Sequence, residues 1–331
     1  MRALTYRIAH DVADFALELT EVAEPTVREL DVLVDVRAVG VNPGEASIRR
    51  TRSAEPGGRV LLGWEFAGVV VETGAAVAGF SRGDRVFGTG DLTRDGSWAE
   101  RVAIDHRILA RIPDGVSFAD AASLPIAALT SWEALFRDQA NLPAGVHRVL
   151  VVGGAGAVGS MATQLLKART GALVISTASR PESKAWSQQM GADFVIDHRT
   201  DVPAQLTEIN VPSVDMILST AKTTDNVGWV AEVLRPFGHL AVVDGSNGLD
   251  LSALTAKSAS LHTELVFSRI INDADPKHQG NILETVSALV TERRVRPIAT
   301  THLQGLTAAT MRTAHTLVET GRTVGKVVIT M

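Results

Sequence analysis

The sequence contains no cysteine among its 331 residues. Without thiols the chain can form no disulfide bond, no thiolate nucleophile and no zinc site that relies on cysteine ligands. The sequence has no apolar run of the roughly 18 residues that a membrane-spanning helix needs. Its N-terminal residues also lack the apolar segment of a signal peptide. We therefore expect a cytoplasmic protein without a membrane anchor.

Positive charge is not in excess either, because the formal net charge at pH 7 is −5. This balance argues against a basic face for nucleic acid and against a polybasic membrane anchor. The nine histidines show no close pair with metal-ligand spacing, so we predict no bound metal, and His262 alone is a candidate proton donor. Hydrophobic residues make up 45% of the chain, enough for a large core, and the length predicts two domains.

A glycine-rich loop in the middle of the chain is its most informative motif. The buried-strand pattern at 148–152 leads directly into Gly-x-Gly-x-x-Gly, and a helical pattern over 158–170 follows, with Gly171 expected as its cap. In a dinucleotide site one such glycine permits the tight turn, one lets the backbone approach the pyrophosphate, and one lets helix and strand pack closely. The residues expected to bind the cofactor here are Gly154, Gly156, Ala157, Val158 and Gly159. The alternative is an ordinary tight turn between a strand and a helix.

The end of the next predicted strand, 172–178, indicates which dinucleotide is preferred. NAD sites carry an Asp or Glu about 20 residues after the glycines, which binds the ribose 2′-hydroxyl. This chain has Ser179 and Arg180 there, and Lys184 follows one turn into the next helix. A hydroxyl and a guanidinium bind a 2′-phosphate that a carboxylate would repel, so we predict NADPH as the cofactor. The alternative is that the two cations are solvated surface charges.

Strands and helices alternate through the middle of the chain, which predicts a doubly wound parallel sheet. The predicted strands are 148–152, 172–178, 193–197, 214–219, 238–243 and 263–267. The predicted helices between them include 158–170, 181–190 and 224–235. Ligands bind at the carboxyl ends of such strands. Further cofactor contacts are therefore expected from Ser219, Thr220, Val243 and Asp244.

The flanking regions have a different pattern. Residues 1 to about 120 are predicted to be β-rich, with strands such as the alternating stretch 31–39 between glycine turns. Near the C-terminus the pattern predicts helices near 277–292 and 307–320 and a last strand at 326–329.

This layout and its motifs resemble the medium-chain dehydrogenase/reductase superfamily over nearly the whole chain. The motifs that carry the resemblance lie at 40–43, 62–70, 83–86, 96–100, 122–125, 129–132, 154–159, 191–193 and 325–328. Within the superfamily the chain is similar to the quinone oxidoreductases, and it looks most like the branch labelled zinc-type alcohol dehydrogenase-like. The resemblance implies an α/β protein with a β-rich GroES-like catalytic domain at 1–122 and an NADP(H)-binding Rossmann domain at 123–266. It also implies that the segment 267–331 returns to the catalytic domain.

The resemblance also bears on zinc. Zinc enzymes of this superfamily place Cys and His where this chain has Asn42 and Trp64, and a further Cys near 125–130. Where those enzymes read Gly-His-Glu, this chain reads Gly63-Trp64-Glu65, so only Glu65 remains as a potential ligand, and one carboxylate cannot hold an ion that needs three protein ligands. The four-cysteine structural lobe is missing at 90–97. We expect a zinc-free enzyme. Without a Lewis acid, quinones and α,β-unsaturated carbonyls remain suitable substrates, because their conjugation spreads the charge that hydride addition creates.

The resemblance assigns roles to five residues. Asn42 would contact the substrate carbonyl or the nicotinamide ribose; the alternative is a turn residue before proline. Ser47 stands where quinone oxidoreductases often carry a tyrosine, and this smaller, weaker acid favours protonation by water. Thr130 would lie beside the nicotinamide, with helix capping as the alternative. Phe267 and Ser268 would hold the carboxamide through backbone groups.

The predicted activity is hydride transfer from NADPH to a quinone, an enone or an enal. An enoyl-thioester or alkenal double-bond reductase is the alternative within the same class. An NADPH-binding sensor without turnover is an alternative of a different class, slightly favoured by the missing tyrosine. The apolar stretch 264–267 is predicted to be a sheet edge that pairs with its counterpart in a homodimer.

Overall fold

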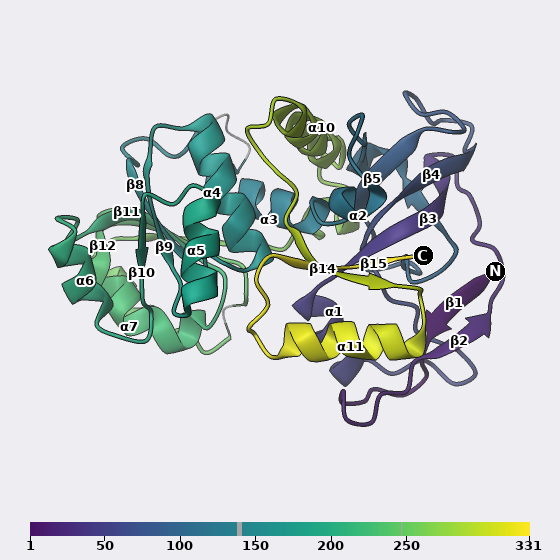
Figure 1. The fold of residues 1–331 in the computed structure, drawn as a ribbon, viewed down its shortest axis with the longest axis horizontal. Helices are drawn as coiled ribbons and strands as arrows, with labels where there is room; N and C mark the ends of the chain where they lie inside the picture. The colour runs from purple at the N-terminus through teal and green to yellow at the C-terminus, as the bar shows by residue number, and fades with distance from the viewer. Residues whose placement is uncertain (138–140, 246) are drawn as a thin grey trace. The chain divides into compact units, whose positions relative to one another are not determined.

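A computed structural model describes residues 1–137, 141–245 and 247–331 of the chain. The chain divides into two compact units: unit 1 comprises Met1–Ile126 and Phe267–Met331, and unit 2 comprises Ala127–Val266. Unit 1 therefore draws on two separate segments, whereas unit 2 is the continuous segment between them (Figure 1). Within the described residues, no helix combines the length and the apolar character needed to cross a bilayer.

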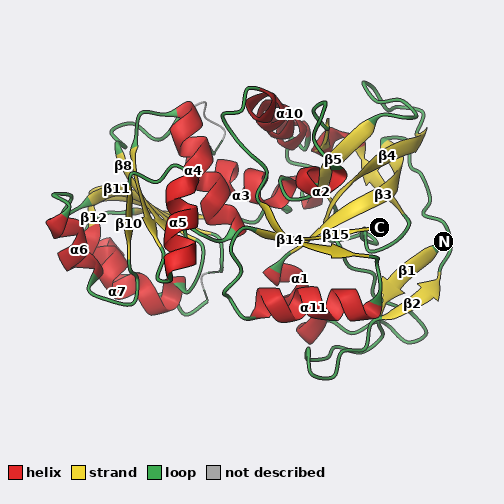
Figure 2. Ribbon diagram, viewed as in Figure 1, coloured by secondary structure: helices red, strands yellow, loops and turns green. Residues whose placement is uncertain are grey.

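Unit 2 is built on a six-stranded parallel sheet. Its strands are β8 (Arg148–Val152), β9 (Leu173–Thr177), β10 (Phe194–Ile196), β11 (Val214–Ser219), β12 (Leu234–Val242) and β13 (Ser260–Thr263). They are ordered β10-β9-β8-β11-β12-β13, and every neighbouring pair is parallel. The chain starts near the middle of the sheet, winds to one edge and then to the other, which is the doubly wound order of dinucleotide-binding domains. The predicted parallel sheet is thereby confirmed (Figure 2).

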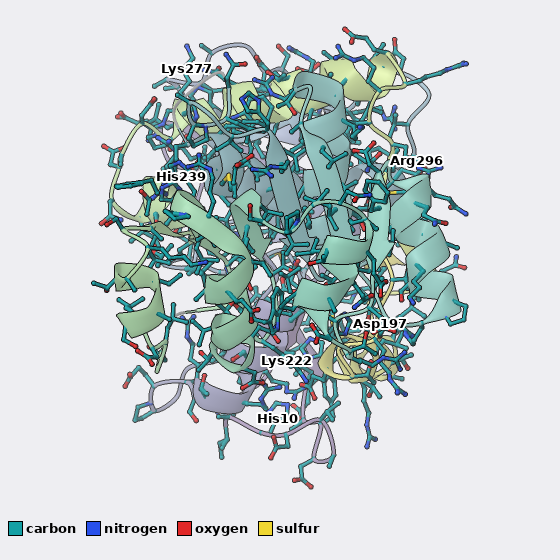
Figure 3. The ribbon with its side chains drawn as sticks, turned by 90° about the vertical axis from the view of Figure 1, so that its left-hand side faces the viewer. His10, Asp197, Lys222, His239, Lys277 and Arg296 are labelled. Atoms are coloured by element: carbon teal, nitrogen blue, oxygen red, sulfur yellow. The ribbon has the colours of Figure 1, made fainter. Side chains whose placement is uncertain are left out.

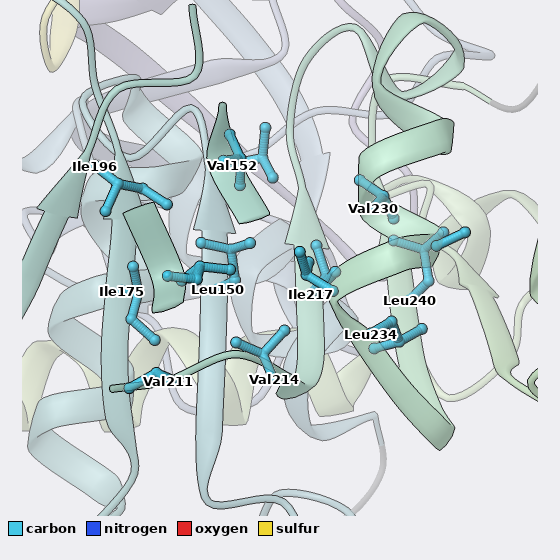
Figure 4. Close-up of a cluster of buried hydrophobic side chains, with 14 of the residues drawn as sticks. Leu150, Val152, Ile175, Ile196, Val211, Val214, Ile217, Val230, Leu234 and Leu240 are labelled. Carbon is cyan, nitrogen blue, oxygen red and sulfur yellow. The ribbon is translucent and has the colours of Figure 1, made fainter. Parts of the chain in front are cut away.

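Helices complete unit 2. They are α3 (Pro125–Phe136, which begins at the end of the first segment of unit 1), α4 (Ala157–Arg169), α5 (Pro181–Gln189), α6 (Val202–Glu208), α7 (Thr223–Val233) and α8 (Ser252–Thr255). On one face of the sheet, Leu150, Ile175 and Ile217 join Leu206 of α6 and Val230 of α7 in a buried cluster (Figure 4). The intervening residues of β8 point to the opposite face and are buried as well, so the sheet is covered on both faces.

Unit 1 is β-rich, as predicted. Its strands are β1 (Arg2–Thr5), β2 (Glu18–Glu21), β3 (Asp31–Val41), β4 (Glu65–Thr73), β5 (Arg85–Thr89), β6 (Arg101–Asp105), β7 (Leu109–Arg111), β14 (Ala299–Gln304) and β15 (Lys326–Thr330). Seven of them form one sheet in the order β14-β15-β3-β4-β5-β7, with β6 paired to β3, while β1 and β2 pair separately. β15 follows unit 2 in the chain and lies antiparallel to β3, so residues from the two segments of unit 1 meet in one sheet.

The helical elements of unit 1 are short apart from two near the C-terminus. They are α1 (Pro43–Thr51), the 3₁₀ helix η1 (His106–Ile108), α2 (Phe118–Ala121), α9 (Ser268–Ile271), α10 (Lys277–Thr291) and α11 (Ala308–Glu319). α1 follows β3 directly, and this junction positions the site of unit 1.

Two local predictions for unit 2 are wrong. The sixth strand was expected at 263–267, but β13 occupies Ser260–Thr263, and Leu265 is exposed outside it. β13 is an edge strand with partly exposed residues, so it lacks the apolar signal that the neighbouring stretch carries. Gly171 does not cap α4: the helix ends at Thr170 in an extended conformation, and the glycine has no positive φ.

Candidate active site

The glycine loop of unit 2 connects β8 to α4 with close backbone approaches. A Cβ atom added to Gly159 would lie 2.3 Å from the carbonyl oxygen of Gly153, and one on Gly154 would lie 2.6 Å from Cβ of Ser176 in β9. Gly153 itself has φ of +77°, a left-handed conformation that favours glycine. Gly153 makes the turn, although it was not among the residues predicted to bind the cofactor. At Gly153, Gly154 and Gly159 neighbouring protein atoms thus leave no room for a side chain.

Gly156 differs from the other glycines of the loop. It is the N-cap of α4, and a Cβ atom there would meet nothing closer than the carbonyl oxygen of Gly153, at 3.5 Å. The Ser160 amide donates to the carbonyl of Gly156 over 2.8 Å and so starts the helical ladder. The amides of Ala157, Val158 and Gly159 precede that first bond, so they are available to an anion at the positive end of the helix. This open cradle fits a pyrophosphate.

Of the predicted residues at the ends of β11 and β12, only some lie against the glycine loop. Thr220, just after β11, donates from Oγ1 to the carbonyl of Val152 over 2.8 Å and packs against Gly153. Ser219 and Asp244 instead accept hydrogen bonds from Thr223, the first residue of α7. The structure therefore brings Thr220 to the glycine loop, whereas the side chains of Ser219 and Asp244 hold the start of α7. Val243 follows β12, and its amide donates to the carbonyl of Ser219 over 3.2 Å.

A cluster of cations surrounds the end of β9. Arg180 is the N-cap of α5. Lys184 Nζ lies 3.5 Å from Asp197 Oδ2, and Arg199 pairs with the same oxygen at 3.0 Å. Arg199 Nη2 also donates to the carbonyl of Ser179 over 2.7 Å. The hydrogen bond from Arg199 holds the pKa of the Asp197 carboxyl well below its usual value. Two cations, Lys184 and Arg199, therefore face one carboxylate.

The sequence analysis missed Arg199 because it follows the third strand of the sheet rather than the second. β10 lies next to β9 in the sheet. A search for basic residues just after the strand that follows β9 in sequence would have found Arg199. Figure 3 shows Asp197 and Lys222, which follow β10 and β11, toward the same end of the unit. That is the end at which parallel strands offer their carboxyl termini to ligands.

His262 lies elsewhere in unit 2. It is in the edge strand β13, where its ring centroid is 5.6 Å from that of His239 in β12. Burial lowers the pKa of both imidazoles, so both are neutral at neutral pH. The structure places His262 beside another histidine and next to β12, away from the ends of β8 and β11 that carry the glycine loop and Thr220.

In unit 1 the start of α1 is held by a buried carboxylate. Asn42 is the N-cap of α1, and its backbone amide donates to Glu45 Oε2 over 2.8 Å. Glu45 Oε1 accepts from the backbone amide of Trp64 over 2.9 Å. Burial raises the pKa of Glu45 to about 7. Asn42 therefore does occupy a turn before proline, as the N-cap of α1. Its bond to Glu45 uses the backbone amide, so the side-chain carboxamide can make other contacts.

The carboxamide of Asn42 belongs to a buried ionic network. The ammonium of Lys326 bonds to Asn42 Oδ1 and pairs with Glu65 Oε2. Asn42 Nδ2 donates to the same Glu65 oxygen over 3.1 Å, and Glu65 Oε1 accepts from the backbone amide of Ile126 over 2.8 Å. The three side chains are each at most 9% exposed. Lys326 entered the sequence analysis only as part of a terminal motif, and its role was missed.

Trp64 stands beside this network, at the position where zinc-containing relatives were expected to carry histidine. It is buried, and its ring centroid lies 5.9 Å from that of Phe267 in an edge-to-face arrangement. No group among the described residues accepts a hydrogen bond from its indole Nε1. Within the described part of the chain, no three His, Cys, Asp or Glu side chains form a group that could hold a metal ion.

The other predicted site residues are not part of the network. Ser47 is exposed on α1, as the fifth residue of that helix. Ser268 begins α9, directly after the buried Phe267. Thr130 lies inside α3 in unit 2 and is 7% exposed, so it does not cap that helix. The helix-capping alternative for Thr130 is therefore wrong.

Comparison with known proteins agrees with this arrangement. Residues 28–114 match the alcohol dehydrogenase GroES-like domain, and residues 190–329 match the zinc-binding dehydrogenase family. A zinc-type alcohol dehydrogenase-like protein of Staphylococcus aureus strain Mu50 is 35% identical over 315 residues, 93% of this chain and 93% of that protein.

Two further relatives carry names that describe an activity. The chloroplast NADPH-dependent alkenal/one oxidoreductase of Arabidopsis thaliana is 34% identical over 209 residues, 60% of this chain and 52% of that protein. The structure of the quinone oxidoreductase from Coxiella burnetii matches with a TM-score of 0.82 at 27% identity, over 100% of this chain and 99% of that one. Since the likeness extends over both units, the chain belongs to the medium-chain dehydrogenase/reductase superfamily of oxidoreductases.

Proposed function

We propose that this protein is an NADPH-dependent, zinc-independent oxidoreductase that transfers hydride to a quinone or an α,β-unsaturated carbonyl. The observation that carries the proposal is the ammonium of Lys326 between Asn42 and Glu65. Zinc requires three protein ligands at this position and an open fourth one. An amide, an indole and a carboxylate already paired with an ammonium do not fit that requirement.

The absence of a Lewis acid from the proposed site limits the substrates. A simple ketone needs strong polarisation of its carbonyl before it accepts hydride. In a quinone or enal, conjugation delocalises the developing charge, and one neutral hydrogen-bond donor is enough to assist. The Asn42 carboxamide is such a donor. The edge-to-face pair of Trp64 and Phe267 suits a planar, conjugated substrate.

NADPH, when bound, supplies the hydride. The open face of the loop at Gly156 fits its pyrophosphate, and Arg180, Lys184 and Arg199 with the hydroxyl of Ser179 suit the 2′-phosphate. Thr130, Phe267 and Ser268 are proposed to lie along the nicotinamide. With serine at position 47 and no other tyrosine than Tyr6 in the chain, water is the proposed source of the proton.

A double-bond reductase acting on alkenals or enoyl thioesters is the second candidate. The named activity of the Arabidopsis relative supports the alkenal branch, and that of the Coxiella relative supports the quinone branch. Both activities would use the same glycine loop for the cofactor and the same hydrogen-bond donor, the Asn42 carboxamide.

NADPH oxidation tests the proposal. The purified protein is mixed with NADPH and either a 1,4-quinone or a small enal, with EDTA present throughout. We expect turnover that survives the chelator, and the ratio of the two rates ranks the branches. Oxidation of a simple alcohol with NADP⁺ that EDTA abolishes would overturn the zinc-independent assignment. Saturable NADPH binding without turnover of any acceptor would favour the sensor.

We also propose that the protein is a homodimer that pairs through β13 rather than through the stretch 264–267. β13 is the edge of the sheet, and Leu265 (53% exposed) follows it by two residues. Phe237 (70% exposed) lies in the neighbouring strand β12, and its amide donates to the carbonyl of Lys257, just before β13, so it adds exposed apolar surface. Sedimentation at micromolar concentration tests this. We expect a dimer, and the Leu265→Asp variant should shift it toward monomer. A monomeric parent protein would contradict the proposal.

A further inference from the structure

We propose that Lys326 is a positioning residue of the reduction: its ammonium fixes the orientation of the Asn42 carboxamide, so that Nδ2 presents an N–H to the substrate carbonyl oxygen. This inference rests on the proposed function. It adds a residue that neither the motifs nor the family match assigns to the chemistry.

The sheet register places the two residues opposite each other. Val327 of β15 pairs with Val41 of β3, so Lys326 precedes and Asn42 follows that pair in the two antiparallel strands. Opposite residues of an antiparallel pair share a face of the sheet. The contact is therefore built into the pairing of two strands and does not depend on a flexible loop.

The chemistry of the contacts determines which way the carboxamide faces. An ammonium can only donate, so the atom of Asn42 that it meets must be Oδ1. Nδ2 then faces Glu65 Oε2, an acceptor, at 3.1 Å. One N–H of Nδ2 is used by this bond, and within the described residues nothing accepts the second. A carboxamide without the ammonium could turn over and present its oxygen, which would repel a developing oxyanion.

Charge balance alone is the competing explanation for the lysine. Glu65 is fully buried and needs a cation nearby. If neutralising Glu65 were the only role of Lys326, removing both charges together would restore the reaction. If Lys326 positions Asn42, the reaction stays slow, because Oδ1 still lacks its donor. The two roles are therefore separable by experiment.

The absence of cysteine makes a clean replacement possible. Lys326→Cys introduces the only thiol of the chain. Unfolded in urea, it is alkylated with bromoethylamine, which restores an ammonium at nearly the original length, or with bromopropane, which gives a neutral side chain of the same shape. Both products are refolded, and the parent protein passes through the same cycle as control. We expect the aminoethyl form to recover kcat/KM to within about threefold and the propyl form to remain about 100-fold slower, with unchanged Kd for NADPH.

A double variant covers the case in which the neutral form does not refold. Lys326→Met with Glu65→Gln removes both charges and keeps an acceptor for Asn42 Nδ2. We expect it to remain about 100-fold slower than the parent, and to respond more steeply than the parent to electron-withdrawing substituents on a series of aryl enals. Recovery of the parental rate and slope would overturn the proposal.

A spectroscopic readout separates this proposal from the proposed function. The side-chain NH₂ resonances of Asn42, assigned by their loss in Asn42→Ala, should be restored in the aminoethyl form and changed in the propyl form. If the parent protein reduces no acceptor, the proposed function fails while these resonances still report on the carboxamide. Identical Asn42 resonances in the propyl and aminoethyl forms would overturn the positioning role.

Discussion

The sites of the two units are built from different parts of the chain. In unit 2 the cradle consists of backbone amides and glycines within the seven residues 153–159, contiguous in sequence. In unit 1 the network consists of side chains, and the hydrogen bond between Lys326 and Asn42 joins positions that are 284 residues apart. The first kind of site depends on local conformation, and the second depends on the pairing of distant strands.

The two kinds of site differ in the substitutions that they tolerate. A backbone cradle tolerates almost no new side-chain atoms, because three of its glycines touch their neighbours. A side-chain network can be rebuilt residue by residue, and here an amide and an indole stand at the positions where zinc ligands were expected. A local backbone loop can therefore stay the same in a fold while a network of distant side chains changes.

The largest expected effect breaks the side-chain site. Glu65→Ala leaves the ammonium of Lys326 buried without its carboxylate, and removing one partner of a buried pair costs about 3–5 kcal/mol. Urea unfolding of the protein, followed by tryptophan fluorescence, measures the loss. Glu292→Ala is the control: it removes an exposed ion pair with Arg294, and we expect less than about 1 kcal/mol. Equal losses would show that the network is not a structural centre.

Two buried groups of unit 1 give stability opposite dependences on pH. Burial raises the pKa of Glu45 from 4.5 to about 7, so its contribution is complete below pH 4.5 and is lost as pH rises to about 7. Burial, and then the Arg49 guanidinium 2.9 Å from Nδ1, lowers the pKa of His315 from 6.5 to about 3. Its contribution is complete above pH 6.5 and is lost as pH falls toward 3.

The two slopes oppose each other between pH 4.5 and 6.5, the unfolded pKa values of the two groups. We expect the parent protein to show a nearly flat unfolding free energy there. Glu45→Gln should make stability rise with pH by about 1.4 kcal/mol per unit, and His315→Gln should make it fall by a similar amount. Urea midpoints across this window measure both. Slopes of the same sign in the two variants would contradict this assignment.

A single methyl group tests the cradle of unit 2. In Gly156→Ala the new Cβ meets no protein atom within 3.4 Å, and φ of −71° suits alanine. The free energy of unfolding should fall by no more than about 1 kcal/mol, because alanine is a poorer N-cap residue than glycine. The methyl group would lie where the pyrophosphate is proposed, and a clash of about 1–3 kcal/mol weakens NADPH binding ten- to hundredfold. Fluorescence titration with NADPH measures Kd. Gly171→Ala is the control: its new Cβ meets no atom within 4 Å, and it should bind NADPH like the parent. If Gly156→Ala also bound NADPH like the parent, the loop would not hold the pyrophosphate.

The smallest effect concerns the choice of dinucleotide. Arg180→Glu replaces a half-exposed cation at the end of β9 with the carboxylate typical of NAD sites. We expect NADPH binding to weaken about tenfold while NADH binding is spared. Arg82→Glu changes the net charge equally on an exposed turn of unit 1 and should alter neither. Equal weakening for both dinucleotides would remove Arg180 from the 2′-phosphate site.

Predictions from sequence succeeded where the signal is local. β8, the glycine loop and α4 lie within about one residue of their expected bounds, because an apolar run, glycines and a helical period occur in order. β13 was missed because an edge strand with polar, half-exposed residues has no such signal, whereas the apolar residues at 265–267 lie outside any strand. The contact between Lys326 and Asn42 has no local signal at all, since strand pairing creates it.

The order of segments in unit 1 has a consequence for biosynthesis. On the ribosome, unit 2 is a continuous stretch and can fold as soon as it emerges. The central strand β3 of unit 1 is made early, but β15, which lies beside it, is translated only after all of unit 2. Until then Asn42 and Glu65 have no lysine partner. The nascent chain can therefore complete unit 2 before the sheet of unit 1 can close.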